Sequence, residues 1–416
     1  MIIEVGYGNS PQIVDVPDEN FIGILDPNEV CVDLKGEEAV KYALKNPVGT
    51  SHLSKIVKPE EKIVIITSDI TRPVPSSIVL PIVLEELWEA GADPDDVTIV
   101  FALGIHRKHT QDEMKKLAGE DVFKKVRCID SDSENFIHMG DTRLGTPVDI
   151  TRVVAEADFR IGIGNIEYHY FAGYSGGAKA IMPGVSTKAA IQSNHSRMVQ
   201  SEAEAGKLDG NPVREDIEEA VKYCPLHFIL NVVLDEHKEI VHAAAGHYIE
   251  AHREGCKFLD KLYRKDIKEK ADIVIASQGG SPKDLNLYQT QKALDNAKHA
   301  VRKDGVIILV GSCKEGLGEE VFEEWMTKSS SPASMIERIQ KDFRLGGHKA
   351  AAIAMVLEDA DIYLVSEMEP GFVKSIFLQP FATVQDALNA ALAKMGEDAS
   401  VLVMPSAGST LPVILR

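Results

Sequence analysis

Short runs of β-branched residues alternate with helical hydrophobic patterns along this chain, and this alternation constrains its fold more than any other feature. In the first half, three runs have the length and composition of buried parallel strands. They are Lys62–Thr67, Val97–Leu103 and Phe159–Gly164, with helical patterns at Val79–Ala90 and Thr187–Gln200. Such alternation predicts an α/β fold, in which largely parallel sheets are flanked by helices.

The second half of the chain repeats this alternation. Its expected strands are Asp272–Ser277, Gly305–Gly311, Ala360–Ser366 and Ser400–Pro405. A chain of 416 residues is too long for one compact core, because cores stop growing at ~250–300 residues. We therefore expect two α/β domains, 1–268 and 269–416, divided at the charged stretch Leu259–Ala271. The last strand is a candidate to return to the first domain, and the active site is expected in the cleft between the domains.

Charge and cysteine content exclude several classes of function. The formal net charge is −19, which argues against nucleic acid and anionic membranes because binding to either requires a basic face. An anionic substrate would therefore need a local pocket of positive charge. The five cysteines are scattered and form no C-x-x-C pair, which is typical of reduced thiols in the cytosol. With no secretory signal at MIIEVGYGNS and no apolar stretch of membrane-span length, we expect a cytoplasmic protein.

Ionisable side chains follow the expected strands at the points where the strands end. In parallel α/β sheets, ligands bind outside the carboxyl ends of the strands. Candidate site residues at these points are Asp69, Arg72, His106, His109, His169, Lys283, Gln289 and Lys292.

Two segments near strand ends carry anion-binding and acid–base side chains. Ser68–Pro73 (SDITRP) can hold a phosphate or carboxylate with its arginine fork and the following helix N-terminus. A helix cap with a surface arginine explains this segment equally well. Gly104–His109 (GIHRKH) offers histidines suited to proton exchange near neutral pH, although a loop histidine can simply be solvated. Thr110 and Glu113 predict a capping box at the next helix.

The most informative segment is Asn165–Ser186 (NIEYHYFAGYSGGAKAIMPGVS). Its glycines allow a backbone to approach a ligand closely, and Lys179 can bind phosphate or, once deprotonated, act as a nucleophile. The segment fits neither the phosphate loop G-x-x-x-x-G-K-[ST] nor the dinucleotide fingerprint G-x-G-x-x-G. A bland flexible loop would not need so many aromatic residues beside its glycines, so the composition favours a functional role.

Other histidines and the helix start after Gly279 are more ambiguous. His195 follows on the next predicted helix, where a single histidine is more often structural than a metal ligand. His242, His247 and His252 suggest a metal-binding stripe, but their alanine and glycine neighbours are typical of packing, and we assign them no role. In Gly279–Lys292 (GGSPKDLNLYQTQK), Tyr288 and Lys292 share one helical face. The amide of Gln289 and the ammonium of Lys292 can together hold a carboxylate, or the segment can be a solvated helix start.

Taken in order, these segments resemble the nickel-pincer lactate racemase family and its 2-hydroxy-acid racemase and epimerase relatives. The resemblance runs through S-D-x-T-R-P, G-x-H-R, E-x-H-x-x-A-G-x-S-G-G-x-K-x-x-x-P-G, N-H and Y-Q-x-x-K. The third motif is highly specific by itself. The others are weak singly, but together and in this order they are strong evidence for the resemblance. All these motif positions match.

The resemblance implies a cofactor and a role for each matching residue. The cofactor is the nickel-pincer nucleotide, Ni(II)-pyridinium-3,5-bisthiocarboxylate mononucleotide, joined to Lys179 as a thioamide, with His195 as the protein's nickel ligand. His106 and His169 match the family's acid–base pair. The cofactor-binding positions are Asp69, Ile70, Thr71, Arg72, Lys179, His195 and Tyr288, and the substrate-binding positions are Arg72, Gln289 and Lys292. Cofactor-maturation proteins are the implied partners.

The resemblance implies a racemase that inverts C2 of a small 2-hydroxy acid by reversible hydride transfer to the cofactor. A C2 epimerase of a sugar acid with the same cofactor is the close alternative. A nicotinamide-dependent dehydrogenase is more distant, because the G-x-G-x-x-G fingerprint is missing, and a non-catalytic nucleotide-binding protein would not need two candidate bases. The substrate's identity, the oligomeric state and any roles of Trp325 and His348 are left open.

Overall fold

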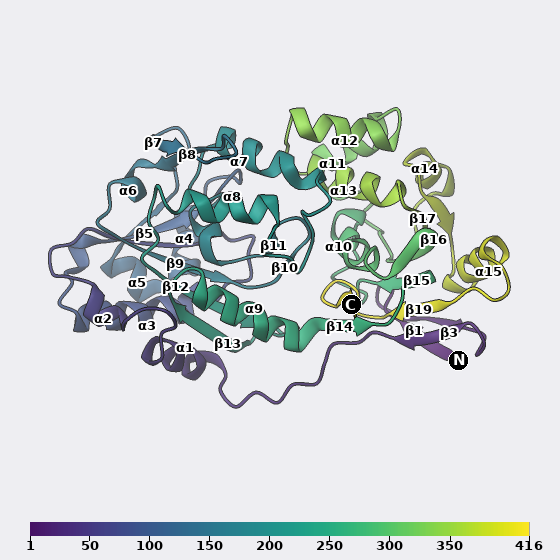
Figure 1. Ribbon diagram of the computed structural model, residues 1–416, viewed down its shortest axis with the longest axis horizontal. Coiled ribbons are helices and arrows are strands. Elements are labelled where there is room, and N and C mark those ends of the chain that lie inside the picture. The colour runs from purple at the N-terminus through teal and green to yellow at the C-terminus, as the bar shows by residue number, and fades with distance from the viewer. Residues whose placement is uncertain (416) are drawn as a thin grey trace. The chain divides into compact units, whose positions relative to one another are not determined.

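The computed structural model describes residues 1–415, which form two compact units (Figure 1). The contiguous unit is Val30–Lys261. The split unit combines Met1–Glu29 with the chain from Leu262 onward. The change of unit at Lys261 lies close to the boundary expected at 268, but the first 29 residues lie with the C-terminal part of the chain.

The contiguous unit is built on a six-stranded sheet of order β13-β12-β9-β4-β5-β6. All neighbouring strands are parallel except β12 and β13, which pair antiparallel. The strands are β4 (Ile63–Ser68), β5 (Val97–Ala102), β6 (Arg127–Asp130), β9 (Phe159–Asn165), β12 (Phe228–Leu234) and β13 (Ile240–Gly246). β4 and β9 are buried on both faces, as β-branched runs in parallel sheets require.

The split unit contains a second six-stranded sheet, of order β18-β17-β16-β15-β19-β3, in which every pair is parallel. Its strands are β3 (Phe21–Ile24), β15 (Ala271–Ser277), β16 (Val301–Val310), β17 (Ala360–Val365), β18 (Gln379–Phe381) and β19 (Val401–Met404). In Figure 1 the purple strand β3 lies beside the yellow strand β19. The α/β fold class with largely parallel sheets is therefore confirmed.

Short strand pairs lie outside the two main sheets. In the split unit β1 (Ile2–Val5) pairs with β2 (Gln12–Asp15), and β14 (Arg264–Ile267) pairs with the last strand, β20 (Leu411–Ile414). In the contiguous unit the pairs are β7 (Phe136–Asp141) with β8 (Pro147–Thr151), and β10 (Tyr168–His169) with β11 (Gly173–Tyr174).

Helices cover the faces of both sheets. In the contiguous unit they are α1 (Gly36–Lys45), α2 (Leu53–Ile56), α3 (Ser76–Glu89), α4 (Gln111–Ala118), α5 (Glu120–Lys125), α6 (Arg152–Ala155), α7 (Lys188–His195), α8 (Pro212–Ala220) and α9 (Glu250–Tyr263), which runs across the unit boundary. In the split unit they are α10 (Leu287–Ala297), α11 (Glu320–Lys328), α12 (Pro332–Lys341), α13 (Gly347–Leu357), α14 (Pro370–Ser375) and α15 (Val384–Met395). None of the helices in residues 1–415 combines the length and apolarity that crossing a bilayer needs.

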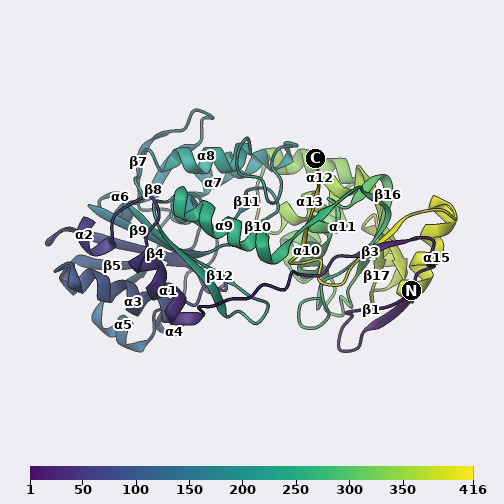
Figure 2. The same cartoon turned by 60° about the horizontal axis from the view of Figure 1, so that its bottom comes forward.

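One face of each main sheet packs into a hydrophobic core. In the contiguous unit Ile65 and Ile99 contribute to a core with Leu44 of α1 and with Leu80 and Leu87 of α3. Figure 2 shows α1 and α3 together on one side of this sheet. The capping box predicted at Thr110 is present at the start of α4. These packed layers fix the strand ends from which the candidate site is built.

Candidate active site

The candidate site residues of the contiguous unit follow the carboxyl ends of three adjacent strands. Parallel strands β9, β4 and β5 lie side by side in this order. The turn 69–72 follows β4, the loop 103–109 follows β5, and the glycine-rich segment follows β9. Because parallel strands end at the same edge of a sheet, these three loops share that edge.

A buried carboxylate holds the first candidate base. Nδ1 of His106 lies 2.5 Å from Oδ2 of Asp69, and the Thr71 hydroxyl donates to Oδ1 of Asp69 at 2.8 Å. The Asp69 side chain is 3% exposed. Burial opposes its ionisation, but the contacts with His106 and Thr71 and the charge of Arg72 outweigh burial and lower the pKa of Asp69. An ionised Asp69 favours hydrogen on Nδ1 of neutral His106, which puts the lone pair on Nε2.

The neighbouring His109 is a structural residue. Its Nε2 accepts a hydrogen bond from the Ile70 N–H at 3.0 Å, so neutral His109 carries its hydrogen on Nδ1. That nitrogen lies 2.6 Å from Oδ1 of Asp130, and the His109 side chain is 1% exposed. Both ring nitrogens therefore serve to join the turn after β4 to the end of β6.

Phe171 brings three of the predicted residues together. Its ring packs edge-on against His169, with centroids 4.5 Å apart, and against His195, with centroids 5.0 Å apart. Nζ of Lys179 lies 5.9 Å from the centre of the same ring. The sequence showed aromatic residues beside the glycines but did not indicate which one would form this common contact.

His169 is held as a neutral imidazole. Its pKa lies well below the ordinary value, first because of burial and then because of the charges of Lys179, His195 and Arg72. The Ala172 N–H donates to Nδ1 of His169 at 3.3 Å. Hydrogen on the neutral ring is therefore on Nε2, which is the opposite arrangement to that of His106.

Buried side chains from three other elements fix the glycine-rich loop. Arg214 of α8 is fully buried and donates to the carbonyl oxygens of Ala172 (3.1 Å), Tyr174 and Gly176 (3.4 Å). Nε2 of His252, on α9, lies 2.7 Å from the carbonyl oxygen of Ser175.

Asn231 of β12 accepts from the Gly177 N–H at 2.8 Å. A β-carbon at Gly177 would lie 2.9 Å from the ring of His252, and its φ of +60° also favours glycine. Sequence reasoning missed these partners, because they lie far along the chain from the loop.

Lys179 follows this loop in a single 3-10 turn, Gly177–Ala180. Its pKa lies well below the ordinary range, because of burial first and then the positive charges of Arg214 and Arg72. Loss of the proton turns an ammonium group into a nucleophilic amine. The position therefore fits covalent attachment of a bound group.

His195 ends helix α7 and is 7% exposed. Its Nδ1 lies 2.8 Å from Oδ1 of Asn194, so the neutral ring has its lone pair on Nε2, as a metal-binding imidazole requires. Residues 1–415 contain no group of three or more histidine, cysteine or acidic side chains that could hold a metal ion. A single imidazole donor of this kind is compatible with a metal that a bound organic group also coordinates.

The remaining predicted residues lie in the split unit, on α10. Asn286 caps this helix, and Gln289 and Lys292 are exposed on it. Tyr288 is half-buried. Nζ of Lys349 lies 4.0 Å from the centre of its ring and donates to its carbonyl oxygen at 2.5 Å.

The two residues left without a role have structural contacts. Trp325 is fully buried and lies beneath the guanidinium of Arg338, whose Cζ is 4.3 Å from the ring centre. His348 accepts from the Gly346 N–H at 3.1 Å. Both belong to the packing around α11 and α13.

Comparison with known proteins places the whole chain beside one family. Residues 7–206 match the family described as "Lactate racemase N-terminal domain", and residues 267–412 match "Lactate racemase C-terminal domain". The chain is 37% identical to a lactate racemase of Thermoanaerobacterium thermosaccharolyticum, over 98% of each chain. It is 32% identical to a lactate racemase of Lactiplantibacillus plantarum, over 97% of each.

Solved structures agree with this placement. The lactate racemase apoprotein from Thermoanaerobacterium thermosaccharolyticum matches with a TM-score of 0.89 at 35% identity, over 100% of both chains. A Thermotoga maritima protein matches with a TM-score of 0.62 at 19% identity, over 92% of this chain and 100% of that one. The second match shows the fold alone.

Proposed function

We propose, since this chain belongs to the lactate racemase family, that it is an isomerase that inverts C2 of a small, lactate-like 2-hydroxy acid. The observation that carries the proposal is the pair His106 and His169 at one edge of a single sheet, near the positive charge of Arg72. Inversion at C2 requires that the substrate's hydroxyl proton be removed or returned whichever enantiomer is bound. Two histidines, one following β5 and one following β9, can each handle this proton for one enantiomer.

The residues present fit the nickel-pincer nucleotide. We propose that Lys179 attaches it covalently, that His195 binds its nickel through Nε2, and that Asp69–Arg72 line its site. Tyr288 of α10 stays a predicted cofactor-binding residue. When bound, the nucleotide would reversibly accept the C2 hydrogen together with its two bonding electrons, that is, as a hydride. Square-planar Ni(II) accepts an imidazole ligand readily.

His106 is suited to take the hydroxyl proton of one enantiomer. With hydrogen on Nδ1, its Nε2 lone pair accepts a proton, and the ring becomes an imidazolium. The buried carboxylate of Asp69, 2.5 Å from Nδ1, stabilises that charge and holds the ring's orientation. The same arrangement of carboxylate and histidine operates in serine protease triads.

His169 begins in the opposite state. Its Nε2–H donates a hydrogen bond to the substrate's C2 oxygen, because Nδ1 faces the Ala172 N–H. To act as a base toward the other enantiomer, the ring must give up this 3.3 Å contact and carry its hydrogen on Nδ1. We propose that the weak contact with Ala172 permits this exchange.

The substrate's carboxylate needs positive charge, because the chain as a whole is acidic. Arg72 on the turn after β4 is exposed, and its charge reaches His169 and Lys179. We propose that Arg72 binds the carboxylate, and that Gln289 and Lys292 of α10 are substrate-binding residues, as the family resemblance implies. Binding the anion also retains the 2-keto acid formed between the two enantiomers.

The test is to produce the protein in a host that carries the cofactor-synthesis genes, and to measure its intact mass and nickel content. A covalent adduct on Lys179 with one nickel per chain is expected. Polarimetry with single-enantiomer lactate, longer hydroxy acids, malate and sugar acids then identifies the substrate. Matured protein that carries neither adduct nor nickel, and that racemises or epimerises none of these acids, would contradict the proposal.

A further inference from the structure

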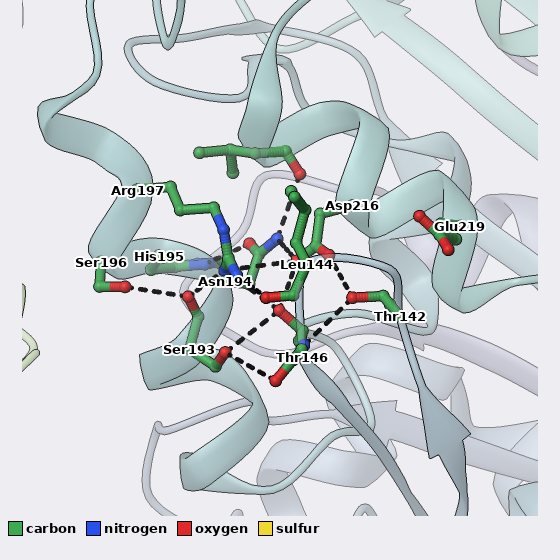
Figure 3. Close-up of polar contacts among 12 residues, drawn as sticks. Thr142, Leu144, Thr146, Ser193, Asn194, His195, Ser196, Arg197, Asp216 and Glu219 are labelled. Carbon is green, nitrogen blue, oxygen red and sulfur yellow. Dashed lines mark hydrogen bonds and ion pairs between the residues drawn. The ribbon is translucent and has the colours of Figure 1, made fainter.

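A buried carboxylate lies behind the proposed nickel ligand. Asp216 of α8 is 1% exposed, and three hydrogen bonds converge on it (Figure 3). Thr142 donates to Oδ1 at 2.5 Å, and Thr146 donates to Oδ2 at 2.6 Å. Asn194 donates to Oδ2 at 2.8 Å, and Nη1 of Arg197 lies 3.7 Å from the same atom. Each of these contacts is a donor or a cation, so both carboxylate oxygens of Asp216 act as acceptors.

The same network fixes which way the Asn194 amide points. Its Nδ2 donates to Asp216 and also to the Val213 carbonyl at 3.1 Å, and both partners can only accept. Oδ1 of Asn194 must therefore face Nδ1 of His195, 2.8 Å away. An amide oxygen accepts but cannot donate, so Nδ1 of His195 carries hydrogen. Figure 3 shows Asn194 between Asp216 and His195.

We propose that Asp216 is a positioning residue that acts through Asn194 to hold His195 in the tautomer whose Nε2 can bind a metal. The inference rests on the proposed function only for the identity of that metal. Histidines that bind metals usually donate their second nitrogen to a carboxylate or a carbonyl, and these partners fix the ring and raise its basicity. In this chain an amide connects the carboxylate to the ring.

A merely structural role for Asp216 would have different consequences. Thr142 and Thr146 belong to the segment between β7 and β8, so Asp216 also ties that segment to α8. Loss of this tie lowers stability without changing the hydrogen position on His195. The decisive measurement is therefore the tautomer of His195, read from the ¹⁵N shifts of its ring nitrogens in full-length protein without cofactor. The His195→Gln variant assigns the signal.

Three variants should change the His195 tautomer and nickel retention to different extents. Asp216→Ala leaves the Asn194 amide without its carboxylate partner, and Asn194→Leu removes the acceptor of the Nδ1 hydrogen. Both should give a mixture of His195 tautomers and, in protein matured with cofactor, nickel loss to a chelator that is about 10- to 100-fold faster. Asp216→Asn keeps an oxygen acceptor toward Asn194, because its NH₂ can face Thr142, whose hydroxyl can rotate to accept. This variant should largely retain the wild-type tautomer and lose nickel only slightly faster.

Glu219→Gln is the matched control. Glu219 lies on the same helix and accepts a hydrogen bond from the Arg143 N–H at 2.8 Å, so its change should leave both the tautomer and nickel retention as in the wild type. Hydrogen on Nε2 of His195 in the wild type would overturn the inference. So would wild-type tautomers and nickel retention in Asp216→Ala and Asn194→Leu. If matured wild-type protein holds no nickel, the proposed function fails, whereas the tautomer measurement still decides this inference.

Discussion

The candidate residues of the two units are held in contrasting ways. In the contiguous unit, a specific partner sets the hydrogen position on each of the three histidines proposed to act in the site: Asp69 for His106, Ala172 for His169 and Asn194 for His195. On α10 of the split unit, Gln289 and Lys292 are exposed. Proton transfer and metal binding require one defined nitrogen, which demands a fixed environment. Holding a carboxylate requires only charge and reach, which long exposed side chains provide.

The largest expected effect of a single change in the contiguous unit is at Lys179. Lys179→Ala removes the amine proposed to carry the cofactor, so matured protein should show no covalent adduct and no racemisation. Intact-mass measurement and polarimetry check both outcomes. Lys188→Ala is the control, because Lys188 is exposed at the start of α7 and should leave the adduct unchanged. Tight retention of a covalent adduct by Lys179→Ala would contradict the assignment.

Asp69→Asn tests whether the fixed environment governs the chemical step. The amide can donate to Nδ1 of His106, which moves the ring hydrogen to Nε2 and removes the proposed base. We expect kcat to fall by roughly 10²- to 10⁴-fold, with a much smaller change in KM. Since two enantiomers have an equilibrium constant of one, kcat/KM must fall equally in both directions. Unchanged kcat would show that Asp69 does not control His106.

Lys292→Ala should behave differently, because it removes charge from an exposed helix. We expect KM to rise by about tenfold, the equivalent of one charge-assisted hydrogen bond, with kcat reduced much less. Steady-state kinetics separate the two effects, and Lys303→Ala, an exposed lysine on β16, serves as the control. If Lys292→Ala lowered kcat as severely as Asp69→Asn, the contrast between the two units would be wrong.

The smallest predicted effect is a pH dependence of stability in the contiguous unit. Burial, and then the charge of Arg214, hold the pKa of His252 well below its ordinary value. In the unfolded chain the imidazole of His252 binds a proton near pH ~6.5. Above that pH the imidazole is neutral in both states, so the free energy of unfolding keeps its full value. As the pH falls toward the folded-state pKa, only the unfolded chain binds the proton, and the free energy of unfolding decreases. His252→Gln should lose less thermal stability between pH 7.5 and 5.5 than the wild type, as measured by the denaturation midpoint.

Local sequence patterns predicted much of the fold. The β-branched runs at Lys62–Thr67 and Phe159–Gly164 form β4 and β9, because a buried parallel strand is encoded within its own residues. The rule that ligands bind at strand ends identified the loops that carry His106 and His169. The same reasoning did not predict that β3 joins the C-terminal sheet, since strand pairing between distant segments has no local signal.

The residues that hold the site in place were harder to predict than the residues proposed to carry out its chemistry. Arg214 and His252 are charged or polar residues on helices, where sequence alone suggests exposure to solvent. Both are fully buried against the glycine-rich loop. Asp69 was expected to line a cofactor site, but its contact with His106 depends on the packing of two separate loops. Contacts between distant segments become visible only once the sheet is assembled.

The pairing of β3 with β19 has a consequence for how the polypeptide folds during synthesis. β3 leaves the ribosome before its partner, Val401–Met404, which is made nearly four hundred residues later. At a synthesis rate of ~5–20 residues per second, β3 is without its partner strand for roughly 20–80 s. The contiguous unit, Val30–Lys261, is synthesised within that interval. Until β19 is made, β3 has an unpaired edge, and unpaired strand edges can pair with other chains.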